Sequence, residues 1–149
     1  MNKILNYIKI NELISTSGQP KIEELELIAN EGFEVVINLA VPTTSNALEN
    51  EDKIVSSLNM SYIYIPVDFE NPKISDLKLF LNVLQALGAN KVWIHCAKNY
   101  RVSAFMYVYH KYILHTPFEQ IDLSIFDKWQ PSLVWQELMK VQLEDLYKA

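Results

Sequence analysis

The sequence predicts an α/β fold: a single three-layer domain with a mainly parallel central sheet flanked by helices. Two observations carry this prediction. Strand-like and helix-like segments alternate along the chain, and several strand-like segments are continuously apolar, as expected of strands covered on both faces. The length of 149 residues suits one domain with a sizeable core. No low-complexity segment or Gly/Ser/Pro linker divides residues 1–149, so we expect them to form that one domain.

The first half of the chain supplies two strands and two helices. A short strand within 10–20 leads into a Ser/Gly/Pro turn, and 22–33 has apolar residues at helical spacing, with Gly32 as the stop. The β-branched run at 34–40 predicts a buried strand. After a loop that contains Pro42, residues 47–59 predict a second helix.

The second half continues the alternation. We expect strands at 60–69 and 91–96 and helices at 75–88 and 101–114. The first of these helices should begin at Ser75 as N-cap, end near Gly88 and bury Leu77, Phe80, Leu81 and Leu84 on one face. Beyond Pro117 the pattern predicts two further helices that separate near Pro131 and pack through Trp129 and Trp135.

Composition limits the function. A net charge of −5 disfavours nucleic acid and anionic membranes as partners. Polar residues interrupt the N-terminal segment, and no run approaches the roughly 18 apolar residues of a membrane span, so we expect a cytoplasmic protein. A lone cysteine makes no internal disulfide and no zinc cluster. We therefore expect no metal and no cofactor, and the sequence does not predict the oligomeric state.

The lone cysteine, Cys96, stands where a predicted strand becomes a helix, in "VWIHCAKNYRVSAF". In parallel α/β sheets the ligand crevice lies beyond the carboxyl ends of the strands. We expect the backbone N–H groups of Ala97, Lys98, Asn99, Tyr100 and Arg101, with the helix dipole, to form a phosphate-binding cradle. The guanidinium of Arg101 matches an oxyanion with two hydrogen bonds. A cysteine at the base of such a cradle ionises readily and is a nucleophile.

A reaction that expels an alkoxide or phenoxide also needs a proton donor. Asp68 stands at the end of the preceding predicted strand, in "YIPVDFENPKI", so it should reach the same edge of the sheet as Cys96. Glu70 is the alternative acid. We expect the loop from Glu70 to Pro72 to move over the site.

Plainer interpretations accompany these. A lone cysteine in apolar surroundings is usually a small buried side chain, but the neighbouring His95, Arg101 and Asp68 together favour a site. Ser103 equally suits the first turn of a helix. The acidic residues at 49–52 fit a solvated helix face. Ser17 and Gln19 in "SGQP" fit either a turn or the lining of the site.

These motifs resemble cysteine-dependent protein phosphatases of the compact dual-specificity type, whose signature is His-Cys-x5-Arg-Ser/Thr. More closely, "TSGQP", "GFEVVINL", "IPVDFENP" and "HCAKNYRVSAF" resemble a bacterial phosphatase-like family of unknown function, whose domain also occurs fused in β-lactamase hydrolase-like proteins. The resemblance covers roughly residues 8–135.

The resemblance implies a mechanism. Cys96 would attack phosphorus to form a cysteinyl-phosphate, and Asp68 would protonate the leaving group. Arg101 and the loop N–H groups would hold the phosphoryl oxygens. Ser103 would help to expel Cys96, and His95 would orient the loop and support the thiolate. The partners implied are a phosphorylated protein or small molecule, and phosphate or sulfate as anions.

The spacing departs from this signature, because four residues rather than five separate Cys96 from Arg101. Either the loop is one residue shorter, or Val102 occupies the arginine position and Arg101 points away from the anion. The usual central glycine is replaced by Asn99, which tolerates a positive φ better than most residues.

Two other functions compete with a phosphatase. A Cys-x4-Arg loop is similar in size to that of rhodanese-like sulfurtransferases, although the Arg-rich, Gly-containing loop typical of them is missing. The third possibility is a binding module for phosphate or phosphopeptides that has lost its chemistry. Asp68 at general-acid spacing and the long helix after it favour the phosphatase.

Overall fold

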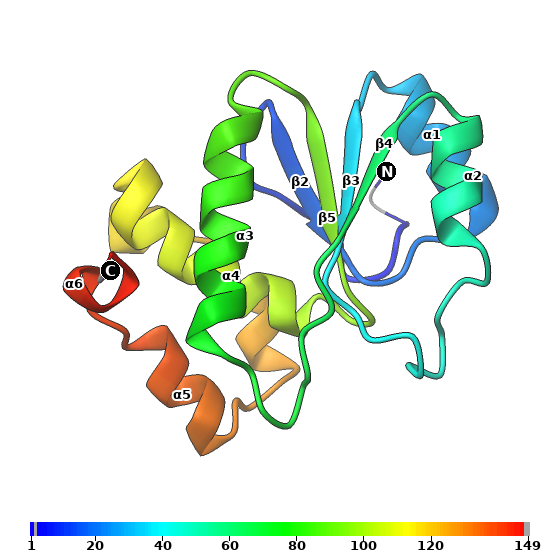
Figure 1. The fold of residues 1–149 in the computed structure, drawn as a ribbon. Helices are drawn as coiled ribbons and strands as arrows, with labels where there is room; N and C mark the ends of the chain where they lie inside the picture. The colour runs from blue at the N-terminus through cyan, green and yellow to red at the C-terminus, as the bar shows by residue number, and fades with distance from the viewer. Residues whose placement is uncertain (2, 148–149) are drawn as a thin grey trace.

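A computed structural model of the chain describes residue 1 and residues 3–147. Its centre is a five-stranded sheet with the strand order β1-β2-β5-β3-β4 (Figure 1). Four strands are parallel: β2 (Ile14–Ser17), β3 (Val35–Asn38), β4 (Ser61–Tyr64) and β5 (Val92–His95). The edge strand β1 (Ile8–Lys9) runs antiparallel to β2. The sequence pattern missed β1 because two residues show no periodicity.

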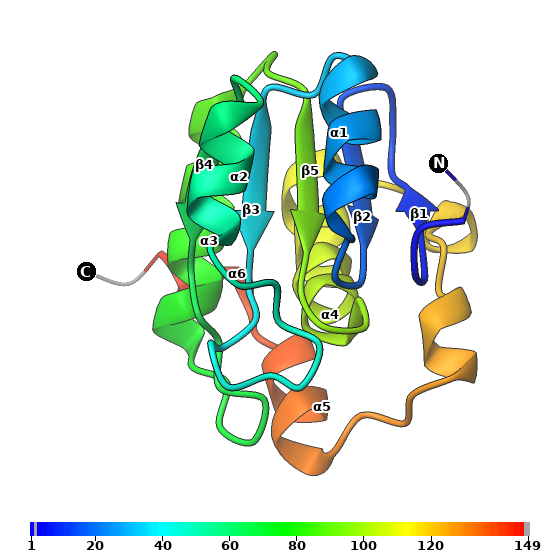
Figure 2. The same cartoon turned by 90° about the vertical axis from the view of Figure 1, so that its right-hand side faces the viewer.

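Helices cover both faces of this sheet, as Figures 1 and 2 show. One face carries α1 (Ile22–Asn30) and α2 (Glu51–Ser57), and the other carries α3 (Ile74–Leu87) and α4 (Tyr100–Tyr109). The two faces have separate hydrophobic cores, because successive side chains of a strand point to opposite sides. Ile94 of β5 packs into the α3/α4 core, and its neighbour Trp93 packs into the α1/α2 core. The predicted three-layer α/β fold is confirmed.

The helix α3 shows how closely the pattern determines the packing. The four residues predicted on its inner face, Leu77, Phe80, Leu81 and Leu84, are all buried. The helix ends at Gly88, which adopts a positive φ of 52°. The predicted start was wrong, because Lys73 is the N-cap and the helix begins at Ile74, before Ser75.

Two other predicted helices differ from expectation: one is shorter, and the other is absent from the described residues. The helix predicted over 47–59 begins only at Glu51, after Asn50 in the left-handed conformation. The first helix predicted beyond Pro117 is replaced by 3-10 turns at Phe118–Gln120 and Ser124–Asp127. Between them the Asp122 carboxylate accepts a hydrogen bond from the N–H of Ser124, which ties the chain into a turn rather than a helix.

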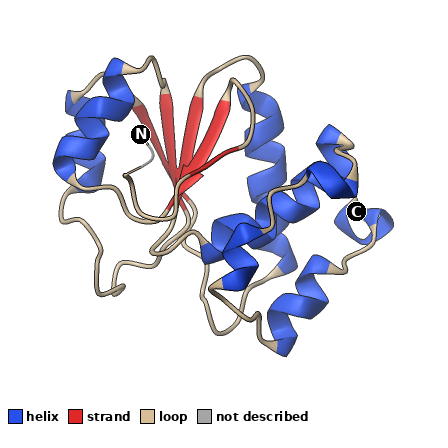
Figure 3. Ribbon diagram, turned by 180° about the vertical axis from the view of Figure 1, so that it is seen from behind, coloured by secondary structure: helices blue, strands red, loops and turns tan. Residues whose placement is uncertain are grey.

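The remaining helical segments lie on the side of the sheet that carries α3 and α4 (Figures 1 and 3). The predicted helix at 101–114 is α4 followed by a π-helical turn, His110–Leu114, and the chain ends in α5 (Leu133–Met139) and α6 (Leu143–Leu146). Trp135 of α5 is fully buried, as predicted. In the described part of the chain no helix has the length and apolar character needed to cross a membrane.

Candidate active site

The central strand β5 delivers the cysteine to the edge of the sheet. His95 ends β5 level with Ser17 of β2 and Asn38 of β3, and Cys96 follows it, fully buried. The chain then turns through Asn99, whose φ of 68° is left-handed, into α4. Asn99 therefore performs the turn that was expected of it, and the cysteine lies below the N-terminus of a ten-residue helix.

The loop that follows Cys96 turns its carbonyl groups toward the protein. The carbonyl of Cys96 faces His95 Nδ1 at 3.1 Å. The carbonyl of Ala97 accepts hydrogen bonds from Gln19 N (3.0 Å) and Asn46 Nδ2 (2.9 Å). The carbonyl of Lys98 accepts one from Asn6 Nδ2 (3.0 Å). The backbone N–H groups of residues 97–101 find no acceptor among the residues that the structure describes. Unpaired N–H groups at a helix N-terminus bind anions.

Arg101 adds a full positive charge to this cradle. It is only 6% exposed and lines the same cavity as Cys96. Its Nε is buried without a hydrogen-bond partner, and no carboxylate of the described residues forms an ion pair with its guanidinium. Because a buried charge without a partner is unfavourable, this side chain is placed to receive an anion from solution.

The position of Arg101 decides between the two alternatives for the short loop. Val102 is fully buried in the α3/α4 core, whereas Arg101 lines the cysteine cavity. The loop is therefore one residue shorter than the phosphatase signature, and the arginine still lines the cavity of the cysteine.

His95 is held from the side opposite the cavity. Its Nε2 lies 2.6 Å from Oε2 of Glu51, and Oε1 of Glu51 accepts a hydrogen bond from Gln19 Nε2, also at 2.6 Å. Burial pushes the pKa of Glu51 upward, but the bond to His95 and its charge, with the bonds from Gln19 and Tyr62, outweigh burial and leave that pKa below 4.5. Glu51 is an ionised carboxylate inside the protein.

Glu51 is also the residue beside the candidate site that the sequence did not reveal. It stands in the acidic run 49–52, which we expected on a solvated helix face, yet only 4% of it is exposed. Its neighbours Glu49 and Asp52 are exposed as predicted. No local pattern distinguishes the three, because the partner of Glu51 lies 44 residues further along the chain.

An aromatic wall borders the cavity above Cys96, and we define it as Phe69, Tyr100 and Trp129. The rings of Tyr100 and Trp129 stack at 5.1 Å and 3°, and Phe69 lies 5.7 Å from Trp129. Trp135 supports the wall from behind, since its Nε1 donates to the carbonyl of Phe69 at 2.8 Å. Trp129 was predicted to pack the last helices, with an aromatic surface for a partner as the alternative, and it also lines the cavity.

The cavity has a volume of about 390 Å³. Besides the wall it is lined by Val41, Thr43, Thr44, Cys96, Ala97, Lys98 and Arg101. Four of the five predicted phosphate-binding residues thus line it, and Asn99 does not, because its side chain bonds to Asn6 and Thr16 on the other side of the loop.

The two candidate acids lie outside the lining of this cavity. Asp68 is exposed beyond the end of β4, and its carboxylate accepts a hydrogen bond from the N–H of Glu70 at 2.9 Å. Glu70 is exposed as well. Only Phe69, between them, faces the cavity. The structure therefore brings Cys96, Arg101 and His95 together and leaves both carboxylates at the margin.

Ser103 is not brought to the cysteine. Its hydroxyl donates to the side-chain oxygen of Asn99 at 3.3 Å, and it lines a small cavity on the β1 side of α4. The shorter loop explains this, because the position directly after the arginine is Val102, a core residue without a hydroxyl. The expectation that Ser103 lies beside Cys96 has no support in this geometry.

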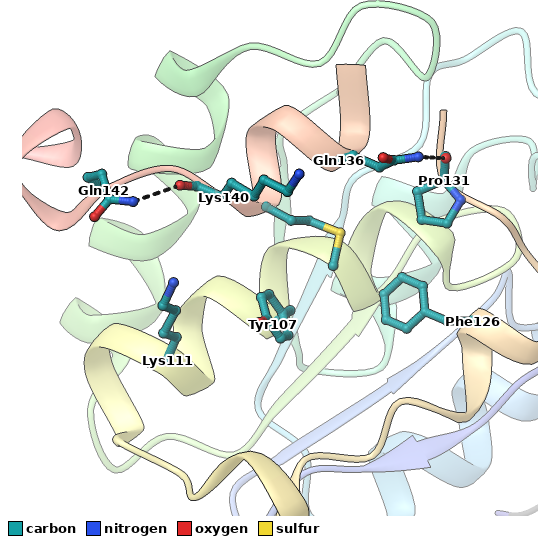
Figure 4. Close-up of a pocket in the computed structure, with 8 residues that line it drawn as sticks. Tyr107, Lys111, Phe126, Pro131, Gln136, Lys140 and Gln142 are labelled. Atoms are coloured by element: carbon teal, nitrogen blue, oxygen red, sulfur yellow. Dashed lines mark hydrogen bonds between the residues drawn. The ribbon is translucent and has the colours of Figure 1, made fainter. Parts of the chain in front are cut away.

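Another cavity, of about 460 Å³, lies between α4 and α5 (Figure 4). Two lysines, Lys111 and Lys140, line it together with Tyr107, Phe126 and Met139. The described residues around it include no cysteine, histidine or carboxylate. It has no thiol beside a helix N-terminus, so we take the Cys96 cavity as the candidate site.

Comparison with known proteins places this geometry in context. No protein-family model and no curated protein matches the sequence. A solved phosphatase-like DUF442 protein from Shewanella putrefaciens CN-32 shares 30% identity and a TM-score of 0.86, over 93% of this chain and 91% of that one. Tk-PTP (18% identity, TM-score 0.72, 91% and 94% covered) and P. aeruginosa TpbA (14%, 0.74, 95% and 88%) share the fold.

Proposed function

Because this chain belongs to the DUF442 family of phosphatase-like proteins, with the fold of cysteine-dependent tyrosine phosphatases, we propose that it hydrolyses a phosphomonoester through a cysteinyl-phosphate at Cys96. One observation carries the proposal. Arg101, buried and without a protein anion, lines one cavity with Cys96, beside backbone N–H groups that have no acceptor among the described residues.

The reaction proceeds in two displacements. The Cys96 thiolate attacks phosphorus, the bond from phosphorus to the ester oxygen breaks, and the leaving oxygen takes a proton from Asp68. Water then attacks the cysteinyl-phosphate, which releases inorganic phosphate and regenerates the thiolate. In both steps Arg101 and the N–H groups of residues 97–101 hold the equatorial oxygens.

The aromatic wall indicates the kind of substrate. Phe69, Tyr100 and Trp129 offer flat apolar faces beside the anion site, which suit an aromatic or otherwise planar leaving group. P. aeruginosa TpbA has been crystallised with phosphotyrosine. A phenoxide also departs with less help from an acid than an alkoxide does, which fits a carboxylate, Asp68, that lies outside the cavity lining.

Sulfur transfer is the second candidate, and the short loop favours it. Only four residues separate Cys96 from Arg101, both of which line the cavity, while Ser103 lies elsewhere. In this reaction the thiolate attacks the outer sulfur of thiosulfate, the sulfur–sulfur bond breaks, and sulfite leaves from the cradle. Cyanide then takes the sulfur from the Cys96 persulfide as thiocyanate. No acid is required.

One set of assays separates the two. Wild type and Cys96→Ser are incubated with an aryl phosphate, with and without vanadate, and in parallel with thiosulfate and cyanide. Phosphate release that vanadate inhibits and Cys96→Ser abolishes supports the phosphatase. Thiocyanate production without phosphate release identifies a sulfurtransferase instead. If neither product forms but vanadate still binds, the domain is an anion-binding module and the proposal is wrong.

A further inference from the structure

The pair formed by Glu51 and His95 joins two elements on the side of the cysteine loop away from the cavity. Glu51 opens α2, His95 ends β5, and both side chains are at most 4% exposed. Their contact of 2.6 Å is shorter than most nitrogen–oxygen hydrogen bonds and is typical of a charge-assisted one. Nothing in the phosphatase mechanism above uses Glu51.

Both ring nitrogens of His95 have an oxygen atom as partner. Nδ1 faces the carbonyl oxygen of Cys96 at 3.1 Å, and a carbonyl only accepts, so Nδ1 carries a proton. Nε2 faces Glu51, whose carboxylate also accepts a hydrogen bond from Gln19. An ionised Glu51 is likewise an acceptor, so Nε2 carries a proton as well. The ring next to Cys96 in the chain thus lies between two acceptors, an arrangement that suits a donor at each nitrogen.

The other charged and titratable groups around this pair come from four elements. Arg101 of α4 and Lys98 of the loop line the cavity on the cysteine side. Tyr62 and Tyr64 of β4 lie on the glutamate side, with Glu49 before α2 and Asp52 within it, and all four line a cavity of about 700 Å³ that also borders Glu51. Of the described carboxylates, Glu51 alone contacts His95.

We propose that Glu51 is a positioning residue that keeps the His95 ring doubly protonated, so that its positive charge and its bond to the Cys96 carbonyl hold the cysteine loop ready for an ionised thiol. The proposal rests on the proposed function only in taking Cys96 as the nucleophile. It applies equally to phosphoryl and sulfur transfer, because both begin with the thiolate.

If Glu51 has this role, its removal changes the ionisation of the Cys96 thiol in the direction opposite to that expected from direct charge repulsion alone. A carboxylate near a thiolate repels it, so removing the carboxylate should by itself favour the thiolate. If Glu51 acts through His95, replacing it with a neutral amide discharges the imidazole, and the thiolate loses a nearby positive charge. Glu51→Gln should then shift thiol ionisation to higher pH.

The test titrates the thiol directly. Since Cys96 is the single cysteine, the ultraviolet absorbance of its thiolate, after subtraction of a Cys96→Ser titration, follows it alone. We expect Glu51→Gln to raise the pH midpoint by about one unit, a tenfold loss of thiolate below the midpoint. Asp52→Asn is the matched control, because Asp52 is an exposed carboxylate in the same helix as Glu51 and lines the same 700 Å³ cavity. In this variant the midpoint of the Cys96 titration should stay at the wild-type value.

A midpoint that stays unchanged or falls in Glu51→Gln overturns the proposal. In a His95→Asn background the effect of Glu51→Gln should disappear, and its persistence would also count against a route through His95. If Glu51→Gln does not fold, nitrogen NMR of the wild-type His95 ring at neutral pH decides: two protonated nitrogens support the proposal, and one refutes it. Absence of phosphatase activity with the expected midpoint shift would reject only the proposed function.

Discussion

The guanidinium of Arg101 lies over the ring of Phe69, 5.2 Å from the ring centre. This cation–π contact is the partner that the structure gives to an otherwise unpaired buried charge. It holds the guanidinium at the wall of the Cys96 cavity without occupying the hydrogen-bond donors that an oxyanion needs. Phe69 therefore both holds the arginine and borders the cavity.

Arg101→Met should retain or raise stability while it abolishes anion binding. The substitution removes a buried Nε without a hydrogen-bond partner, which offsets the lost contact with Phe69, and it keeps most of the apolar stem, so the free energy of unfolding should stay level or rise by up to about 1 kcal/mol. Vanadate or phosphate affinity should fall at least about 100-fold. Urea unfolding and anion titration measure the two effects. Arg101→Lys is the control that keeps the charge, and a large loss of stability in Arg101→Met would contradict the unpaired state of this side chain.

Asn99 is expected to contribute both a backbone conformation and three side-chain hydrogen bonds. Its amide bonds to Asn6 O, Thr16 Oγ1 and Ser103 Oγ at 2.8, 3.0 and 3.3 Å. Asn99→Gly keeps the positive φ and loses the bonds, so we expect a loss of about 2 kcal/mol in the free energy of unfolding. Asn99→Ala should lose about 1 kcal/mol more, because alanine resists a φ of 68°. Equal losses in the two variants would show that the left-handed backbone carries no cost.

Gly18 should tolerate no side chain, because the cysteine loop passes directly over it. A Cβ at this position would lie 2.7 Å from the carbonyl oxygen of Ala97 and 2.9 Å from Leu5 Cδ2. We expect Gly18→Ala to displace the loop, lower turnover at least about tenfold and destabilise the protein by about 2 kcal/mol.

The contrasting variant is Gly32→Ala, in which the new methyl group meets nothing within 4 Å but the φ is 91°. It should lose about 1 kcal/mol of stability through backbone strain alone and keep wild-type turnover. Turnover measurements on the two variants separate a displaced site from a merely weakened fold. Full activity in Gly18→Ala would mean that the loop adjusts freely.

His110 should make stability fall as the solution becomes mildly acidic. Burial lowers the pKa of His110 below 6.5, and its Nδ1 lies 2.8 Å from Thr116 Oγ1. In the unfolded chain this histidine takes up a proton near pH 6.5, while in the folded protein it stays neutral until lower pH. The unfolded state thus binds more protons, and the free energy of unfolding decreases as pH falls through and below 6.5.

The measurement compares urea unfolding of wild type and His110→Gln at about pH 7.5 and about pH 5.5. We expect a smaller pH dependence in the variant, whose amide does not titrate. The depressed pKa of Glu51 acts in a separate window below 4.5, so it does not contribute to this difference. A pH dependence equal in both proteins would assign the effect to another group.

Local chemistry explains the features that the sequence predicted correctly. The inner face of α3, the burial of Trp135 and the left-handed turn at Asn99 each depend on periodicity or on the conformational preference of one residue. The place of Cys96 at the carboxyl edge of the sheet follows from the α/β alternation. Such features are encoded within a few residues of where they appear.

The features that could not be predicted depend on contacts between distant segments. Glu51 and Glu49 look alike in the sequence, and only the folded chain places one against His95 and the other in solvent. The aromatic wall joins residues 69, 100 and 129, which no spacing rule connects. The position of Ser103 follows from one missing loop residue, whose effect on the helix register appears only when Val102 is seen in the core.

Asn6, near the start of the chain, binds two segments of its second half at once. Its Nδ2 donates to Lys98 O, its backbone oxygen accepts from Asn99, and its Oδ1 accepts from Lys128 Nζ at 2.7 Å. During synthesis on the ribosome, the hydrogen bond from Lys128 to Asn6 can form only after residue 128 has emerged. The set of contacts that holds the cysteine loop through Asn6 is therefore completed late in translation.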